Sequence, residues 1–140
     1  MHRLFPPFLG GTAAIGLLLV RIAAGLALMM HGWPKIQNPT AWMPGGFPPY
    51  ALAAAAVAEF VGGACLIVGL ITPLWAAAAA GTMCVAISFH ANKGDPYLSK
   101  GGASYELAVA YLAICLLLVL TGPGKLSIDA VLFGKRKATL

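Results

Sequence analysis

Residues 11–32 read GTAAIGLLLVRIAAGLALMMHG, an apolar run that is interrupted by a single charged residue, Arg21. A helix needs about 20 mostly apolar residues to cross the hydrocarbon core of a bilayer. This stretch meets that requirement, and it therefore predicts a transmembrane helix near the start of the chain.

Three further segments have a similar composition, at about residues 50–71, 73–90 and 103–121. Glu59 is the one charge inside the first of them, and Glu106 lies in the first turn of the last. Because a bilayer offers no hydrogen-bond partners to open strands, these spans are expected to be helices. The sequence predicts an all-α, four-helix transmembrane bundle with up-down-up-down topology, in one domain over residues 1–140.

The boundaries between the spans carry turn signals. Thr72 and Pro73 suit a helix N-cap followed by a first-turn proline, so the connection between spans two and three should be tight. These two spans are then antiparallel neighbours. A short segment, residues 125–133, is expected to lie along the surface as an amphipathic helix. Gly62, Gly63 and Gly81 offer small surfaces on which helices can approach closely.

The composition supports the same class. Sixty per cent of the 140 residues are hydrophobic and only 9% are charged, against roughly 25% charged in soluble domains. Too few charges are present to cover a soluble surface, which excludes a soluble enzyme, a disordered tail and a nucleic-acid-binding module. The net charge of +5 does not change this, because the basic cluster at residues 135–137 flanks apolar spans and suits anionic lipid headgroups.

The basic residues also predict an orientation. With four spans, both termini share one side of the membrane. That side carries five basic residues: Arg3, Lys125, Lys135, Arg136 and Lys137. The other side carries three: Lys35, Lys93 and Lys100. Because basic residues are enriched on the cytoplasmic side, the termini are expected in the cytoplasm. The chain is then a multi-pass membrane protein, and in a bacterial cell its membrane would be the inner one.

Two charges fall inside the predicted spans and need partners. Arg21 precedes His31 by ten residues, and Glu59 follows Tyr50 by nine. If His31 and Tyr50 lie at the same face of the membrane, the charges of Arg21 and Glu59 each lie about 14–15 Å below that face. The sequence therefore predicts an Arg21–Glu59 ion pair near the midplane. Such a pair either fixes helix register or forms the polar floor of a binding cavity.

A second polar layer is expected nearer the outer interface, where His31, His90 and Glu106 end or begin their spans and Lys35 follows His31 by one turn. These residues could form a proton relay, an acidic-ligand site or a metal site. No short His spacing supports a metal site, so none is predicted. Tyr111, five residues beyond Glu106, could direct its hydroxyl toward the deeper layer.

The cysteines add no site of their own. Cys65, Cys84 and Cys115 are widely spaced inside apolar runs, and no C-x-x-C motif occurs. They are interpreted as packing residues rather than as a disulfide framework or a metal site.

Several short motifs follow one another over the four predicted spans. They are Arg21 and Gly25, HGWPK at 31–35, AEFVGG at 58–63, GLITP at 69–73, Met83 with His90, Glu106 with Tyr111, and GPGKLSID at 122–129. In their order and spacing these motifs resemble those of the DoxX family of small four-helix bacterial membrane proteins, and the resemblance covers essentially the whole chain. No single motif is specific alone.

The resemblance implies a connection to quinone or redox chemistry, since the family is named from a subunit of an archaeal thiosulfate:quinone oxidoreductase. Other members are linked to resistance against catechols and quinones or to membrane oxidoreductase assemblies. Thiosulfate oxidation is not carried over, because no residue identifies a thiosulfate site. The paired cysteines of thiol–quinone four-helix enzymes are also missing from this sequence.

The leading hypothesis is an oxidoreductase subunit that handles a quinone or a similar small hydrophobic redox partner. In this hypothesis Arg21 and Glu59 form the floor of the cavity. A quinone oxygen is hydrogen-bonded or protonated by His31, His90 and Glu106. Lys35 adds positive charge at the mouth of the cavity. Tyr111 is a further ligand-binding candidate. Electrons would come from a redox partner protein, because no flavin or haem motif occurs.

Two alternatives remain open. The same polar layers could form the pathway of a small-molecule carrier or exporter, and because four spans are few, that hypothesis expects a homo-oligomer. In the second alternative the chain is a non-catalytic scaffold subunit of a membrane complex, and its charges only set helix packing. Membrane lipid is the common partner in all three hypotheses, and nucleic acid is a partner in none.

Overall fold

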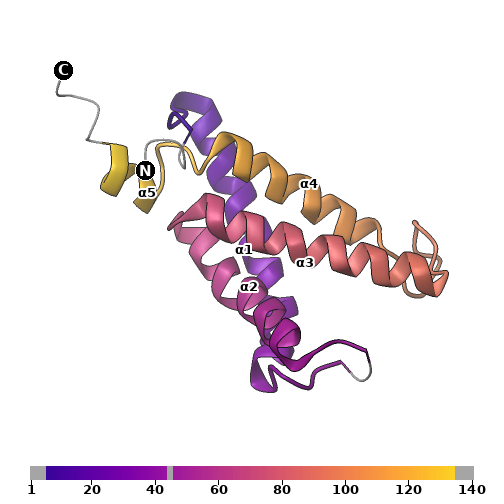
Figure 1. Cartoon of the computed structure of the whole chain (residues 1–140). Helices are drawn as coiled ribbons and strands as arrows, with labels where there is room; N and C mark the ends of the chain where they lie inside the picture. The colour runs from indigo at the N-terminus through magenta and orange to yellow at the C-terminus, as the bar shows by residue number, and fades with distance from the viewer. Residues whose placement is uncertain (1–5, 44–45, 135–140) are drawn as a thin grey trace.

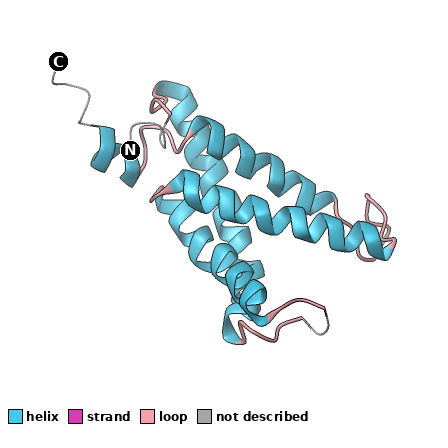
Figure 2. Ribbon diagram, viewed as in Figure 1, coloured by secondary structure: helices cyan, strands magenta, loops and turns pink. Residues whose placement is uncertain are grey.

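The computed structural model describes residues 6–43 and 46–134, and within these ranges the chain is helical with no strand (Figure 2). The described helices are α1 (Gly11–Gln37), α2 (Pro49–Val68), α3 (Thr72–Lys93), α4 (Glu106–Thr121) and α5 (Ile128–Phe133). The predicted all-α fold, with four long helices and a short C-terminal segment, is confirmed.

The four long helices form two antiparallel hairpins. α1 packs mainly against α2, and α3 packs mainly against α4, whereas α1 and α4 touch little. The hairpins lie close together near the α2–α3 turn and diverge toward their other ends (Figure 1). The diverging ends carry the α1–α2 and α3–α4 loops, and the start of α1 lies with α5 at the joined end (Figure 1).

Three of the helices are long and apolar enough to cross a membrane: α1 with 27 residues, α2 with 20 and α3 with 22. α4 is also apolar but has 16 residues, which makes it about 24 Å long and shorter than a typical hydrocarbon core. α1 continues through Pro34 as far as Gln37, so the proline does not end the helix.

Glycines let α1 and α2 approach each other closely. A Cβ atom on Gly25 would lie 2.6 Å from the carbonyl oxygen of Gly63, and one on Gly32 would lie 2.6 Å from the backbone nitrogen of Phe60. The close approach predicted at Gly62 and Gly63 is therefore confirmed, with Gly62 against the Trp75 ring. The prediction for Gly81 is wrong, because a Cβ there would meet nothing within 4 Å.

The α2–α3 turn is as tight as predicted. Gly69 ends α2 in the left-handed region at φ 72°, and Ile71 precedes α3 at φ 49°. The expectation that Thr72 caps α3 is wrong, because Thr72 is already the first helical residue and its hydroxyl forms no hydrogen bond in the described structure. The carboxylate of Asp129 takes this role and accepts hydrogen bonds from the backbone N–H groups of Ile71 at 2.6 Å and Thr72 at 2.8 Å.

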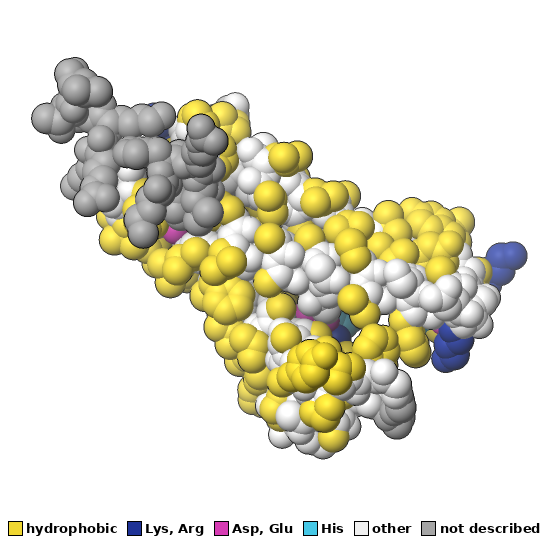
Figure 3. Space-filling view, in the orientation of Figure 1, with side chains coloured by type: hydrophobic (Ala, Val, Ile, Leu, Met, Phe, Trp, Pro, Cys, Tyr) yellow, Lys and Arg dark blue, Asp and Glu magenta, His cyan; other side chains and the backbone are white. Residues whose placement is uncertain are grey.

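The core lies where the two hairpins meet, and it is built largely of small and aliphatic side chains from all four long helices, among them Leu28, Leu66, Ala79 and Leu118. Many large apolar side chains point outward instead. They include Leu19 (62% exposed), Met30 (77%), Leu74 (56%) and Leu120 (75%). Because water would penalise this exposure, the outer surface is suited to contact with lipid, as Figure 3 shows by its extensive hydrophobic area.

Candidate functional site

A buried ion pair joins α1 to α2. The Lys35 ammonium lies 2.7 Å from each carboxylate oxygen of Glu59, so one cation contacts both oxygens. The Glu59 side chain is 3% exposed and the Lys35 side chain is 24% exposed. Because α1 passes through Pro34 without ending, it places Lys35 one turn beyond His31 and within reach of α2. The pair presents its lysine side, rather than its carboxylate, to the surroundings.

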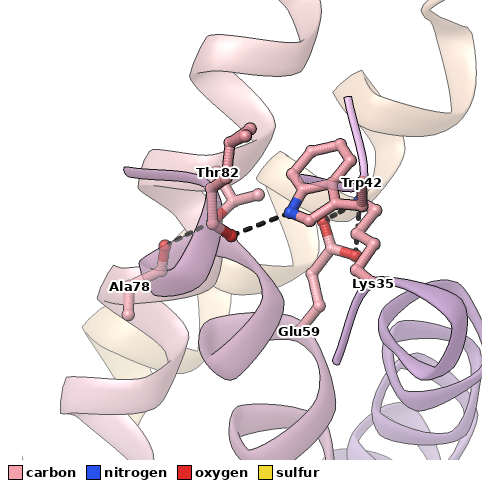
Figure 4. Close-up of polar contacts among 6 residues, drawn as sticks. Lys35, Trp42, Glu59, Ala78 and Thr82 are labelled. Atoms are coloured by element: carbon pink, nitrogen blue, oxygen red, sulfur yellow. Dashed lines mark hydrogen bonds and ion pairs between the residues drawn. The ribbon is translucent and has the colours of Figure 1, made fainter. Parts of the chain in front are cut away.

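Trp42 of the α1–α2 loop covers this pair. The Lys35 ammonium lies 4.5 Å from the centre of the Trp42 ring, which is a cation–π distance. The indole N–H of Trp42 donates a 2.9 Å hydrogen bond to the carbonyl oxygen of Leu52, which fixes the loop against α2. Figure 4 shows the Trp42 indole next to Lys35 and Glu59.

The predicted Arg21–Glu59 ion pair is wrong, because Glu59 pairs with Lys35 and the Arg21 guanidinium bonds elsewhere. Glu59 is level with Gly32, since a Cβ on Gly32 would lie 3.0 Å from the Glu59 Cβ. Between Arg21 and Gly32 the helix rises by about 16 Å. The prediction assumed that His31 and Tyr50 share a level. α1 extends beyond His31 by more than a turn, and Tyr50 instead lies at the start of α2.

Arg21 lies at the joined end of the two hairpins. It is fully buried, and one guanidinium nitrogen, Nη2, donates a 2.6 Å hydrogen bond to the carbonyl oxygen of Leu126. The other two nitrogens, Nε and Nη1, have no partner among the described residues. The guanidinium lies against Gly69, where a Cβ would overlap Nη1. Arg21 therefore connects α1 to the α2–α3 turn and the C-terminal segment, away from Glu59.

His31 and Tyr111 form a contact between the two hairpins. Their ring centres are 6.4 Å apart and the rings meet edge to face, one from α1 and the other from α4. His31 is exposed and Tyr111 is half-buried, and neither side chain forms a hydrogen bond with another described residue. Both rings therefore keep polar atoms available to a ligand. We call His31, Lys35, Glu59 and Tyr111 the polar layer.

The space-filling view shows basic, acidic and histidine side chains together in a hollow toward the start of α2, where the two hairpins diverge (Figure 3). Hydrophobic side chains lie beside this hollow, together with uncharged polar side chains or backbone. The polar layer combines side chains from α1, α2 and α4, since Lys35 contacts Glu59 and His31 contacts Tyr111. A small apolar molecule with a polar head could be held there by hydrogen bonds and by ring contacts.

The other residues predicted for the outer layer do not join this group through a direct contact. His90 Nδ1 lies 2.6 Å from the Asp95 carboxylate, five residues along the chain. The Glu106 side chain has no hydrogen bond within the described part of the chain, although its backbone N–H donates to Tyr97. In residues 6–43 and 46–134 no three His, Cys, Asp or Glu side chains are close enough to hold a metal, so no metal centre is assigned.

A second, shallow groove of about 620 Å³ runs along α3 beside the α1–α2 loop. It is lined by Phe47, Cys84, Val85, Ser88, Phe89, Asn92 and Lys93. This lining includes no member of the polar layer, and most of it is apolar. The groove is therefore a feature of the outer surface of α3 rather than part of the candidate site.

Few features of the sequence pointed to the contacts that the structure adds. Asp129 belongs to the GPGKLSID motif at 122–129, and Ser127 two residues earlier is a recognisable N-cap, but neither pointed to α3. The Lys35–Glu59 pair was hidden because Pro34 suggested an interrupted helix. The cover formed by Trp42 depends on the path of a long loop, which local sequence does not define.

The comparisons with known proteins agree with this architecture. The family model DoxX matches residues 16–92, more than half of the chain. The chain is also similar to the inner membrane protein YqjF of Escherichia coli (strain K12), with 32% identity over 126 residues that cover 84% of this chain and 92% of that protein. No solved structure matches. The chain is therefore an integral membrane protein that belongs to the DoxX family.

Proposed function

We propose that this protein is an oxidoreductase subunit of the inner membrane that binds a quinone, or a similar small hydrophobic redox partner, at the polar layer. The observation that carries the proposal is the buried Lys35–Glu59 pair, 2.7 Å long, beside the exposed His31 ring and its neighbour Tyr111. Ionisable side chains inside membrane helices are costly and are concentrated at ligand and proton pathways.

The lysine of the pair is suited to bind a carbonyl oxygen. An ammonium group has three N–H donors, and Glu59 accepts from this group with its two oxygens. In the proposal the remaining donor is directed to a quinone oxygen. The positive charge of Lys35 would also stabilise the negative charge that develops on this oxygen during reduction.

His31 and Tyr111 supply the second set of groups. The aromatic faces can stack on a quinone ring, and the imidazole can donate a proton to the second carbonyl oxygen. Reduction of a quinone to a quinol adds two electrons and two protons, one proton on each oxygen. The protons would come through His31 and Lys35, and the electrons from a redox partner protein, since no flavin or haem motif occurs in the sequence.

His90 and Glu106 remain proposed proton-relay residues at the outer side. The Asp95 carboxylate contacts one ring nitrogen of His90, which leaves the other for a water or a ligand. Glu106 begins α4, the helix that also carries Tyr111. Arg21 does not belong to this proposed site, because its guanidinium bonds to the carbonyl oxygen of Leu126 at the joined end of the hairpins.

The test is native mass spectrometry of the protein purified in mild detergent, followed by titration of the empty protein with short-chain ubiquinone and menaquinone analogues. The proposal expects a bound quinone in the unmodified protein and at least about tenfold weaker binding in Glu59→Gln and His31→Ala. Lys100→Gln, a lysine substitution in the α3–α4 loop, is the matched control and should leave binding unchanged. An empty protein that binds neither analogue would refute the proposal.

A further inference from the structure

The end of α3 brings the side chains of His90 and Asp95 together. The backbone N–H of Gly94 donates to the carbonyl oxygen of Ala91 at 3.1 Å, and that of Asp95 donates to the carbonyl oxygen of His90 at 3.0 Å. Gly94 adopts the left-handed region at φ 85°. These two hydrogen bonds define a Schellman turn, in which side chains at the positions of His90 and Asp95 become neighbours. The backbone itself therefore holds the two side chains side by side.

The pair in this turn is ionisable, although the turn does not require it. The usual contact at these two positions is between hydrophobic side chains. Here His90 Nδ1 lies 2.6 Å from a carboxylate oxygen of Asp95, the length of a strong hydrogen bond to a charged group. Among the described residues, no lysine or arginine forms an ion pair with Asp95. A hydrophobic pair would complete the turn equally well, so the choice of these two side chains points to a task for the imidazole.

The imidazole ring of His90 is also held by an aromatic contact. The Phe89 ring meets it edge to face, with the ring centres 5.5 Å apart. Phe89 in turn contacts Phe47 of the α1–α2 loop, with 6.2 Å between the ring centres. The second ring nitrogen of His90, Nε2, has no hydrogen-bond partner in the part of the chain that the structure describes. The ring is thus oriented through one nitrogen, and its other nitrogen is available.

We propose that Asp95 is a positioning residue that keeps the hydrogen of the neutral His90 ring on Nδ1, so that Nε2 exchanges protons at the diverging ends of the hairpins. An ionised carboxylate has acceptors and no donor, so a hydrogen bond to it requires a hydrogen on Nδ1. Nε2 then carries a lone pair and accepts a proton. Asp95 orients the ring and stabilises the positive charge that the ring gains, without touching the transferred proton.

The step is a proton transfer alone and needs no oxidant or reductant. An N–H bond forms at Nε2 as an O–H bond of a hydronium ion breaks and leaves water. The ring returns to its neutral form when it passes the proton on. The inference rests on the proposed function for the destination of this proton, which is a quinone oxygen during reduction. The tautomer of His90, in contrast, does not depend on a quinone.

Nuclear magnetic resonance of the full chain in micelles, with isotope-labelled histidine, reads the tautomer from the ring nitrogen shifts. The neutral His90 ring, identified by its loss in His90→Gln, should carry its hydrogen on Nδ1. Asp95→Leu supplies the hydrophobic contact that is usual in this turn, so the chain should stay folded while the ring shifts toward the Nε2–H form. Lys93→Leu, at an exposed residue of the same turn, is the matched control and should leave the tautomer unchanged. A hydrogen on Nε2 in the unmodified protein, or the same tautomer in Asp95→Leu, would overturn the proposal.

Voltammetry of the protein with a bound short-chain quinone tests the proton transfer, because the electrode replaces the redox partner protein. Asp95→Leu should slow proton-coupled reduction by about tenfold, less than the loss of a whole acid–base group, and leave quinone affinity unchanged. Adding Asp95→Leu to His90→Gln should cause no further loss, since Asp95 acts through the ring. An unchanged rate in Asp95→Leu would overturn the role of Nε2. A protein that binds neither quinone analogue would instead refute the proposed function, and the tautomer would still decide the role of Asp95.

Discussion

The Lys35 ammonium contacts both carboxylate oxygens of Glu59 at 2.7 Å, and this pair connects α1 to α2 where the two hairpins begin to diverge. The position matters because burying a carboxylate is costly unless a cation pairs with it, and the Glu59 side chain is 3% exposed. The Lys35 side chain is 24% exposed, and the Trp42 ring lies over its ammonium group. The same pair therefore serves helix packing and can serve ligand binding.

The pair should contribute strongly to stability. Lys35→Met leaves a buried carboxylate without its cation and is expected to reduce the free energy of unfolding by about 3 kcal/mol. Glu59→Leu should cost less, because the lysine can reach a more polar environment. The double variant should recover most of the loss. Unfolding by denaturant titration in detergent micelles measures all three, and additive losses in the double variant would show that the two residues do not interact.

The glycine contact between α1 and α2 gives a second prediction. Gly25→Ala places a Cβ 2.6 Å from the Gly63 carbonyl oxygen, so the helices must separate, with an expected cost of about 1–3 kcal/mol. Gly81→Ala is the matched control, since a Cβ there meets nothing and alanine favours helix by about 0.5–1 kcal/mol. Thermal unfolding in micelles compares them. Equal midpoints for both variants would contradict the close contact.

The sequence predicted where the helices lie along the chain, but it did not predict which residues of neighbouring helices lie at the same level. Long apolar runs identify spans in a bilayer, and turn residues such as Gly69 and Pro73 locate the tight connection. Which residues share a level depends on where each helix begins and ends. The prediction placed Arg21 opposite Glu59 because it took His31 and Tyr50 as equivalent ends, a choice that local sequence could not test.

The sequence identified which residues are candidates for the site, but it did not predict which of them contact each other. The sequence alone made candidates of all four residues of the polar layer: His31, Lys35, Glu59 and Tyr111. An ionisable or polar residue among apolar neighbours can be recognised in the sequence without knowledge of its partner. Their pairing needed the three-dimensional structure, because partners such as Lys35 and Glu59 lie on different helices. Asp129 was missed as the cap of α3 because the two lie far apart in sequence.

The cap formed by Asp129 leads to a third prediction. Asp129→Ala removes both acceptors and leaves the N–H groups of Ile71 and Thr72 buried without partners, at an expected cost of about 2–3 kcal/mol. Asp129→Asn retains one acceptor and should cost about 1 kcal/mol. Asp95→Ala, which breaks a more exposed contact with His90, is the control and should cost less than about 1 kcal/mol. Denaturant titration ranks the three variants, and a cost for Asp129→Ala no larger than the control's would refute the capping role.

Trp42 gives the last prediction, which concerns the cover over the Lys35–Glu59 pair. Trp42→Ala removes both the ring over the lysine and the hydrogen bond to Leu52, whereas Trp42→Phe keeps a ring and loses only the bond. We expect exchange of the amides around the α1–α2 loop to rise by about tenfold in Trp42→Ala and by less than about threefold in Trp42→Phe.

The same two variants distinguish a cover from a purely structural support. If Trp42 covers the ammonium, the alanine variant should change the rate at which short-chain quinone analogues bind while the helices remain folded by circular dichroism. Trp33, which lies on α1 against Phe60 and is exposed, supplies the control substitution Trp33→Ala. Faster loop exchange in Trp33→Ala than in Trp42→Ala would be incompatible with this arrangement, because only Trp42 lies over the lysine and bonds to Leu52.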